Sequence, residues 1–418
     1  MHHSFFNGLR ICAGCFLSGV ALHTPLSYFS FRRRQFVKTI FIILSLLLCI
    51  DTVSLAQNYR VSPGDTLNSI SIAADGMIMF RIYSPQADTV RIGGPDIPEN
   101  LRSTPMVKQQ NGVWDATIGP LPPGAYRYSF IVDGALVMDP RNPSISEANA
   151  NPWSIMYVPG ADFMDTKNIP HGAVAEVNYY SSSLQKFRRM HVYTPPGYNA
   201  NTKKYPVFYL LHGAFDTDDA WTTVGRAGYI LDNLIAGKKA VPMIVVMPAG
   251  HTGPFTFGAP SRETARDEFT EDFLNDLKPY IEKNYRVLNS RKHRAIAGLS
   301  MGGMQTLNIA IPHLNEYAHI GVFSSGIFEL GGMNFMAVPG SSWEERNAAF
   351  LKNTLWKKGL RTFWFATGKE DFLLTVSSKT IELFQKYNFP VVFRESGGGH
   401  TWANWREYLN EFAPLLFR

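Results

Sequence analysis

Two near-continuous apolar runs constrain the fold of this chain more than any other feature. They are YPVFYLL at 205–211 and VPMIVVM at 241–247. Such runs are typical of strands buried on both faces of a mostly parallel sheet. Residues 227–236, between the runs, have a helical pattern, and residues 268–284 carry apolar side chains at four-residue spacing, as an amphipathic helix does. This alternation predicts an α/β domain.

Strands and helices keep alternating to the end of the chain, so we expect one α/β domain over residues 176–418. Further strands are expected at 293–297, 320–323, 362–366 and 391–395, with helices at 303–311, 343–357 and 376–387 and a last helix from near Asn404.

Residues 57–159 show a different pattern of short segments in which apolar residues alternate. Examples are MIMFRIY at 77–83, GVWDATI at 112–118 and YRYSFIV at 126–132, separated by turns rich in Gly and Pro. Several short strands with turn signals between them predict a small all-β sandwich. We expect a loose linker at 160–175 to join it to the α/β domain.

The first 56 residues are predicted to be an export signal with an upstream extension. The basic segment FRRR at 31–34 precedes the apolar run TIFIILSLLLCI at 39–50, and small residues lead to Ala56. This layout is typical of a secretory signal cut after Ala56. The apolar run is shorter than the ~20 residues that a membrane-spanning helix needs. We therefore expect a secreted or periplasmic protein with no stable membrane span in the mature chain.

Charge and cysteine content exclude several function classes once this segment is set aside. It holds five of the 40 Lys and Arg residues, one of the 34 Asp and Glu residues, and all three cysteines. The remainder is nearly neutral and has no patch that indicates nucleic-acid binding. It also lacks a thiol for a disulfide or a thiolate metal site, and it shows no zinc spacing, phosphate loop or dinucleotide fingerprint. We expect no metal and no cofactor.

The segment GLSMG at 298–302 matches the pattern G-x-S-x-G. A predicted strand leads into it and a predicted helix leads out, which is the context of a nucleophile elbow. Side chains at Gly298 and Gly302 are expected to crowd the serine, and the helix N-terminus favours negative charge there. Ser300 is therefore the candidate nucleophile. The alternative is a plain glycine-rich turn.

A nucleophilic serine needs a base, and the base needs an acid that orients it. His400 follows a predicted strand in the glycine-rich loop SGGGH. Asp371 follows the strand at 362–366, at the sheet edge where open α/β sheets bind ligands. Glu370 is the rival acid. We favour Asp371 because its shorter side chain follows the turn into the loop.

The charge that develops on the substrate oxygen needs two backbone N–H donors. Met301, directly after the nucleophile, supplies one. The other is expected from the loop after the strand at 205–211, where Ala214 is the first candidate and Gly213 the second. We expect His212 to hold this loop by hydrogen bonding.

Several other side chains are candidates for substrate contact. Trp221, Phe255, Phe257 and Trp402 lie in loops near the expected cleft, where they could face an aromatic acyl group or simply pack the loops. Arg226 could hold a substrate oxygen or pair with a surface acid.

The segments YLLHG, GLSMGG and GGHTWANWREYL, in this order, resemble the esterase D-like α/β-hydrolases. These include feruloyl and acetyl-xylan esterases of carbohydrate esterase family one, enterochelin esterases, formylglutathione hydrolases and mycolyltransferases. The resemblance covers about residues 176–418. It implies Ser300, Asp371 and His400 as a catalytic triad in the family's chain order, with an oxyanion hole after the histidine of YLLHG. Ala214 replaces a third glycine of many relatives, which leaves a backbone donor in place.

Residues 112–140 resemble the immunoglobulin-like module of glycogen-branching enzymes, carbohydrate-binding module family 48. Bacterial esterases with a similar pairing often act on plant cell-wall polysaccharide. The resemblance therefore implies a serine esterase that removes feruloyl or acetyl groups from xylan-type polymers. The N-terminal domain is expected to shape substrate access without supplying catalytic groups.

Two other readings remain open. One is a siderophore trilactone esterase, whose anionic ferric substrate would require more cationic side chains in the cleft than Arg226. The other is a non-catalytic carbohydrate-binding protein with a decayed hydrolase domain, against which a complete set of triad residues weighs.

Overall fold

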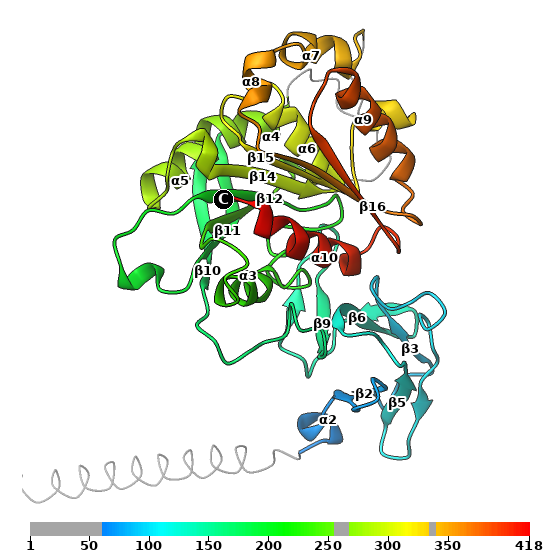
Figure 1. The fold of residues 1–418 in the computed structure, drawn as a ribbon. Coiled ribbons are helices and arrows are strands. Elements are labelled where there is room, and N and C mark those ends of the chain that lie inside the picture. The colour runs from blue at the N-terminus through cyan, green and yellow to red at the C-terminus, as the bar shows by residue number, and fades with distance from the viewer. Residues whose placement is uncertain (1–60, 255–266, 334–339) are drawn as a thin grey trace, which may run out of the picture. The chain divides into compact units, whose positions relative to one another are not determined.

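The computed structural model describes residues 61–254, 267–333 and 340–418 (Figure 1). The expected export signal, with its cut after Ala56, lies outside these residues, as do Phe255 and Phe257. No helix within the described ranges is long and apolar enough to cross a membrane. Residues 63–418 form one compact unit.

An eight-stranded sheet forms the centre of the C-terminal half, in the order β10-β11-β13-β12-β14-β15-β16-β17. The first two pairings are antiparallel and the others are parallel. This is the expected mostly parallel sheet of an α/β-hydrolase. The strands are β10 (Ala173–Ser181), β11 (Lys186–Thr194), β12 (Val207–Leu211), β13 (Ile244–Pro248), β14 (Arg294–Leu299), β15 (His319–Phe323), β16 (Thr362–Gly368) and β17 (Val391–Ser396).

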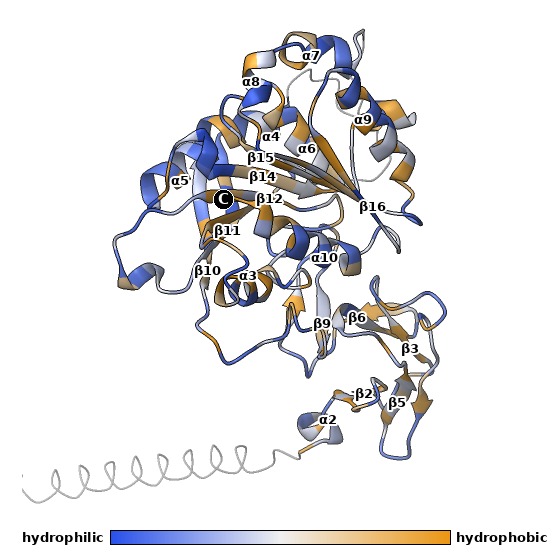
Figure 2. Ribbon diagram, in the orientation of Figure 1, coloured by the Kyte–Doolittle hydropathy of each residue, from blue (hydrophilic) through white to orange (hydrophobic). Residues whose placement is uncertain are grey.

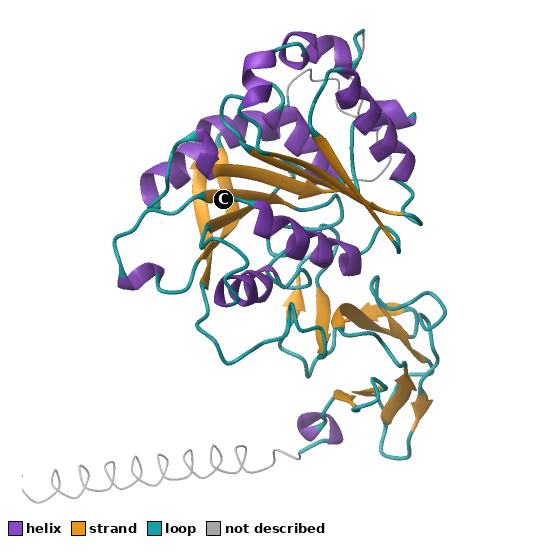
Figure 3. Cartoon of the chain, in the orientation of Figure 1, coloured by secondary structure: helices purple, strands orange, loops and turns teal. Residues whose placement is uncertain are grey.

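Alternate residues of β12 belong to two hydrophobic clusters on opposite faces of the sheet. Val207, Tyr209 and Leu211 pack with side chains of α6 and α9, whereas Phe208 and Leu210 pack with side chains of α3 and α10. Burial on both faces explains the continuous apolar runs. Figure 3 shows helices on both sides of the sheet. These are α3 (Ala227–Ala236), α4 (Glu268–Asp272), α5 (Lys278–Asn284), α6 (Met301–Ala310), α7 (Trp343–Leu351), α8 (Thr354–Lys358), α9 (Leu374–Lys386) and α10 (Trp402–Phe412).

The predicted helix at 268–284 forms with a π-helical turn between α4 and α5. In Figure 2 the outer helices α7 and α9 carry both hydrophobic and hydrophilic segments, as amphipathic helices do. Helix formation in these segments therefore follows the periodicity of the sequence, although the helical region expected at 343–357 is divided into α7 and α8.

The N-terminal domain is an all-β sandwich of two antiparallel sheets, ordered β1-β2-β5-β4 and β3-β6-β9-β8, with β7 paired to β6. Its core includes Phe80, Trp114 and Tyr128. The fold class predicted from the sequence is confirmed for both domains. After a short helix α2 (Pro63–Thr66), the strands are β1 (Ile70–Ile72), β2 (Ile78–Tyr83), β3 (Val90–Gly93), β4 (Val107–Lys108), β5 (Val113–Ile118), β6 (Gly124–Val132), β7 (Ala135–Val137), β8 (Ile145–Ser146) and β9 (Trp153–Val158).

The segment expected as a loose linker, 160–175, is instead tied to α3 and the residue before it. Arg226 donates to the carbonyl of Met164 and to the hydroxyl of Thr166, both at 3.0 Å. Asn233 donates to backbone carbonyls of the same segment. Polar side chains satisfy the irregular backbone here, which apolar periodicity alone does not reveal.

Candidate active site

Ser300 lies in the tight turn between β14 and α6. Its backbone has φ 51° and ψ −119°, a region that non-glycine residues rarely adopt and that is characteristic of strained functional turns. The Ser300 N–H donates to the Phe323 carbonyl at 2.9 Å, and the Ser300 carbonyl accepts from the Ser325 hydroxyl at 2.5 Å. Hydrogen bonds from β15 and the residues after it therefore hold the turn in the elbow geometry expected from the sequence.

The glycines of this turn are required by backbone contacts. A Cβ at Gly298 would lie 2.3 Å from the backbone of Gly302, and one at Gly302 would lie 2.5 Å from the carbonyl oxygen of His212. Side chains at these two glycines would therefore clash first with neighbouring backbone, and not with the serine as expected. The turn folds back on itself and packs against the end of β12, and side chains would separate these backbones.

His400 and Asp371 form a direct pair after β17 and β16. The His400 Nδ1 atom lies 3.0 Å from both carboxylate oxygens, and Asp371 also accepts from the Leu373 N–H at 2.8 Å. Burial raises the pKa of the Asp371 carboxyl, but the hydrogen bond and charge of His400 outweigh it, so this pKa lies below its usual value. The structure therefore brings Asp371 to the histidine, whereas the Glu370 side chain is exposed.

Two aromatic rings flank His400. Trp405 meets it edge to face at 5.0 Å between ring centroids and donates from its indole to the Ser324 hydroxyl at 3.0 Å. Phe372 lies 4.5 Å away on the ring centroids and is 64% exposed. Phe372 is not among the candidates expected from the sequence, although it directly follows the candidate acid.

The loop after β12 (residues 212–222, here the β12 loop) lies beside the Ser300 turn. β12 pairs in parallel with β14, with Leu211 opposite Gly298. A Cβ on Gly213 would lie 3.5 Å from the Cβ of Ser300. Gly213, one of the two residues expected to supply the second oxyanion donor, therefore lies next to the candidate nucleophile.

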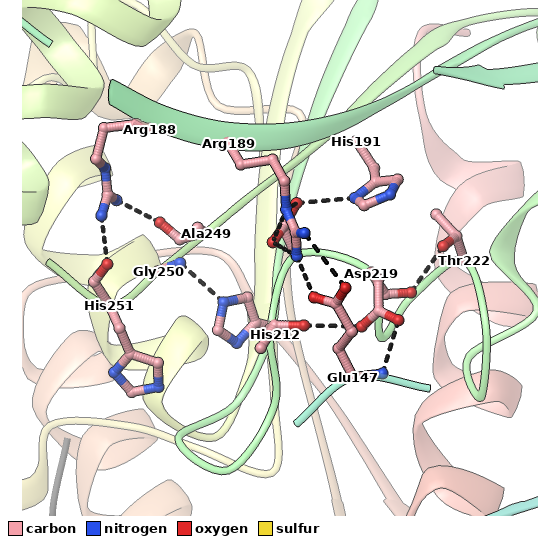
Figure 4. Close-up of polar contacts among 12 residues, drawn as sticks. Glu147, Arg188, Arg189, His191, His212, Asp219, Thr222, Ala249, Gly250 and His251 are labelled. Carbon is pink, nitrogen blue, oxygen red and sulfur yellow. Dashed lines mark hydrogen bonds and ion pairs between the residues drawn. The ribbon is translucent and has the colours of Figure 1, made fainter. Parts of the chain in front are cut away.

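Two histidines hold this loop, the buried His212 and the partly buried His251. Figure 4 shows the contact between His212 and Gly250. The Gly250 N–H donates to His212 Nε2 at 2.8 Å, so the proton lies on Nδ1, which is 2.8 Å from the Gly213 carbonyl oxygen. His251 Nε2 lies 2.8 Å from the Ala214 carbonyl oxygen. Burial lowers the pKa of both imidazoles to about 4, so both are neutral near pH 7. His212 thus has the loop-holding place expected of it.

Met301 is the first residue of α6. The first N–H groups of a helix have no acceptor within the helix, so this N–H points toward the helix N-terminus, where Ser300 lies. The candidate donors therefore come from two adjacent segments, the β12 loop and the start of α6.

Trp221 and Trp402 pack inside the domain, the alternative that the sequence left open, whereas Arg226 contacts two tyrosine rings and, among the described residues, pairs with no surface acid. The two indoles are 1% and 2% exposed and pack edge to face at 5.0 Å. The Arg226 guanidinium is buried 3.6 Å above the ring of Tyr157 and 4.2 Å from that of Tyr229. The two indoles belong to the hydrophobic core of the domain, and Arg226 donates to Met164 and Thr166.

The acidic residues Asp216, Asp218 and Asp219 of the β12 loop are all buried. Each accepts hydrogen bonds from protein groups. Within the described part of the chain, no group of three or more His, Cys, Asp or Glu residues could hold a metal ion.

Two family models match the chain. The model described as "Putative esterase" matches residues 181–416, and the model described as "Carbohydrate-binding module 48 (Isoamylase N-terminal domain)" matches residues 69–153. The resemblances inferred from the sequence motifs are thereby confirmed.

Curated relatives include the endo-1,4-beta-xylanase/feruloyl esterase of Xylanibacter ruminicola, 35% identical over 62% of this chain and 36% of that protein. Endo-1,4-beta-xylanase Y of Acetivibrio thermocellus is 24% identical over 63% of this chain and 25% of that protein. The chain therefore spans well under half the length of these two relatives.

Solved structures also resemble the chain. A ferulic acid esterase is 29% identical over 58% of this chain and 97% of its own, with a TM-score of 0.51. The enterobactin esterase of Shigella flexneri covers 82% of this chain and 94% of its own at 16% identity and a TM-score of 0.55. At that identity the second likeness shows the fold alone.

The close packing at Gly302 predicts a loss of stability on substitution. We expect Gly302→Ala to lower the free energy of unfolding by ~1–3 kcal/mol, because the added methyl group must separate the turn from β12. The matched control is Gly253→Ala, since a Cβ there meets nothing within 4 Å. Urea unfolding followed by circular dichroism measures both, and equal midpoints would contradict this packing.

Proposed function

We propose that this chain, which belongs to the family described as "Putative esterase", hydrolyses carboxylic esters with Ser300 as its nucleophile. The observation that carries the proposal is the pair of His400 Nδ1 and the buried Asp371 carboxylate, 3.0 Å apart. The three residues of the proposed triad each follow a parallel strand: Ser300 follows β14, Asp371 follows β16 and His400 follows β17. All three therefore lie at the carboxyl edge of one sheet.

In the proposed reaction, Ser300 Oγ attacks the ester carbonyl carbon while His400 Nε2 takes its proton. Asp371 keeps the His400 proton on Nδ1 and stabilises the imidazolium that forms. The N–H groups of Met301 and Ala214, or Gly213 in place of Ala214, donate to the developing oxyanion. His400 then protonates the leaving alcohol, and water activated by the same imidazole hydrolyses the acyl-enzyme.

We further propose an aromatic acyl group on a xylan-type polysaccharide as the substrate. Phe215 directly follows the candidate donor Ala214, and Phe372 directly follows Asp371; both rings are 64% exposed. Large apolar rings beside polar groups suit a ligand with an aromatic face. The match to a carbohydrate-binding module and the similarity to a xylanase/feruloyl esterase support a polysaccharide ester, with acetyl as the smaller alternative. We also propose that residues 1–56 direct export.

A siderophore trilactone is the second candidate substrate, because an enterobactin esterase shares the fold over most of the chain. An anionic ferric siderophore requires available cations. Arg226, the one cation expected at the cleft, is buried between tyrosine rings. This placement favours the polysaccharide ester. A non-catalytic carbohydrate-binding role would leave the Asp371–His400 pair without a use.

The choice of acid predicts unequal effects of two neighbouring substitutions. Asp371→Asn should lower kcat for p-nitrophenyl acetate by about 10⁴-fold, because an amide favours the wrong imidazole tautomer. Glu370→Gln, which removes an exposed charge one residue away, should leave kcat within about twofold. Steady-state kinetics on both variants decide the matter. A larger loss from Glu370→Gln would mean that the acid is misassigned.

The exposed rings predict selectivity for an aromatic acyl group. The wild-type chain should release ferulate from arabinoxylan in preference to acetate. Phe372→Ala should raise KM for methyl ferulate by ~2–10-fold, since one aromatic contact contributes ~0.5–1.5 kcal/mol, and should leave KM for p-nitrophenyl acetate unchanged. The control is Leu355→Ala, which removes another exposed side chain, on α8. Release of acetate alone, or equal KM changes with both esters, would argue against the feruloyl assignment.

A further inference from the structure

The β-sandwich contacts the α/β domain at the β12 loop, which carries the candidate oxyanion donors. Residues 147–149 run alongside this loop. Ala148 forms an isolated antiparallel bridge with Asp216, and the Asn149 N–H donates to the Phe215 carbonyl at 3.0 Å. The backbone of the N-terminal domain is thus hydrogen-bonded to the residues that directly follow Gly213 and Ala214.

An ion pair strengthens this contact. Arg127 of β6 places Nη1 2.6 Å from Asp216 Oδ1, and its Nε lies 2.8 Å from Asp96 of its own domain. The Arg127 and Asp216 side chains are only 9% and 5% exposed. Burial raises the pKa of the Asp216 carboxyl, and the positive charge of Arg127 opposes this rise. The charged form of Asp216 is therefore stabilised by Arg127. The Asp216 N–H donates to the Gly213 carbonyl at 3.2 Å, which links the pair to a candidate donor residue.

A second row of charges continues from the sandwich through the loop to β11 (Figure 4). The Glu147 carboxylate pairs with Arg189. Arg189 Nη2 also lies 2.8 Å from the Asp218 carboxylate, and His191 Nδ1 lies 2.8 Å from Asp218 as well. The Glu147 N–H donates to Asp219 at 2.8 Å. The middle of the β12 loop is therefore bound from both domains.

The sandwich is also attached to the helix that follows His400. Arg406 of α10 is 3% exposed and donates from Nη1 to the carbonyl of Ala125 in β6 at 3.1 Å and to that of Val224 at 2.9 Å. Burial lowers the pKa of this guanidinium to about 10, so it stays charged near pH 7. The β12 loop and α10 therefore both have hydrogen-bonded anchors in the N-terminal domain.

We propose that Arg127 is a positioning residue for the oxyanion hole, and that the N-terminal sandwich is through it a structural part of the active site. The inference rests on the proposed esterase function. Arg127 touches no reacting atom and acts through Asp216 on the backbone of Gly213 and Ala214. Oxyanion donors work only within a narrow distance range, and a displacement of about 1 Å can cost about 10²-fold in rate. The sandwich thus does more than shape substrate access, the role expected from the sequence.

The test compares two buried arginines in the full chain. Arg127→Met removes the pair with Asp216. Arg294→Met is the matched control: Arg294 is 6% exposed and pairs with Glu282 and Glu316, but it begins β14, at the end opposite Ser300. With p-nitrophenyl acetate, at a temperature where circular dichroism shows both variants folded, we expect Arg127→Met to lower kcat by ~10–100-fold with KM within about threefold. Arg294→Met should keep kcat within about twofold.

A second readout separates positioning from a general loss of structure. Phenylboronic acid forms a tetrahedral adduct with a nucleophilic serine, so its Ki reports the oxyanion donors. We expect Ki to rise in Arg127→Met by about the same factor as kcat falls, and to stay unchanged in Arg294→Met. Arg127→Lys keeps the charge but lacks the guanidinium fork that spans Asp96 and Asp216. It should show a smaller parallel change in kcat and Ki, and it carries the test if Arg127→Met does not fold.

Wild-type kcat and Ki in a folded Arg127 variant would overturn the inference, as would equal losses in Arg294→Met. Ser300→Ala distinguishes this failure from failure of the proposed function. If Ser300→Ala keeps its activity, the proposed esterase mechanism itself is wrong. If Ser300→Ala is inactive while Arg127→Met and Arg127→Lys are both fully active, only the positioning role is refuted.

Discussion

The turn at Ser300 packs against the carboxyl end of β12, and the rest of the site depends on this contact. The backbones are so close that a single methyl group at Gly302 would lie 2.5 Å from the His212 carbonyl oxygen. Because β12 and β14 are neighbours in parallel register, their ends emerge at the same sheet edge. The contact therefore places the candidate nucleophile beside the backbone of Gly213. Hydrogen bonds from β15 and from the imidazoles of His212 and His251 then hold each side of the contact.

The β12 loop contains several buried acidic side chains. Removing them from water costs free energy, and their hydrogen bonds fix the direction of the loop backbone. Asp216, Asp218 and Asp219 each lie below 10% exposure, and each accepts hydrogen bonds from another segment. Buried ion pairs add little net stability, because desolvation offsets the attraction. Losing one partner is far more harmful, since it leaves an unpaired buried charge. Such pairs suit a loop whose backbone direction matters more than its contribution to folding.

Much of the α/β domain could be predicted from the sequence because burial leaves a direct mark on it. Strands covered on both faces appear as continuous apolar runs, as at Val207–Leu211. Asp371 and Glu370 both follow the end of β16, so strand position alone does not separate them; Asp371 contacts His400 in the structure, and its catalytic role stays a prediction. In contrast, β10 carries mostly exposed side chains, so burial leaves only a weak mark on its sequence.

Contacts between distant segments could not be predicted in the same way. Trp221 and Trp402 occupy loop positions in the sequence, yet these loops fold back and bury both indoles in the core. Arg127 lies 89 residues from Asp216, and an arginine in an alternating strand is usually solvent-facing. The contact of Arg127 with Asp216 depends on how the two domains pack together, and a local sequence pattern does not predict such packing.

Covalent capture of the nucleophile tests the central claim most directly. The chain would be treated with the organophosphate diethyl p-nitrophenyl phosphate, digested, and analysed by mass spectrometry. The account predicts one diethylphosphoryl adduct, on the peptide that contains Ser300, formed as esterase activity is lost. An adduct on a different serine with loss of activity, or full inactivation with Ser300 unmodified, would contradict it.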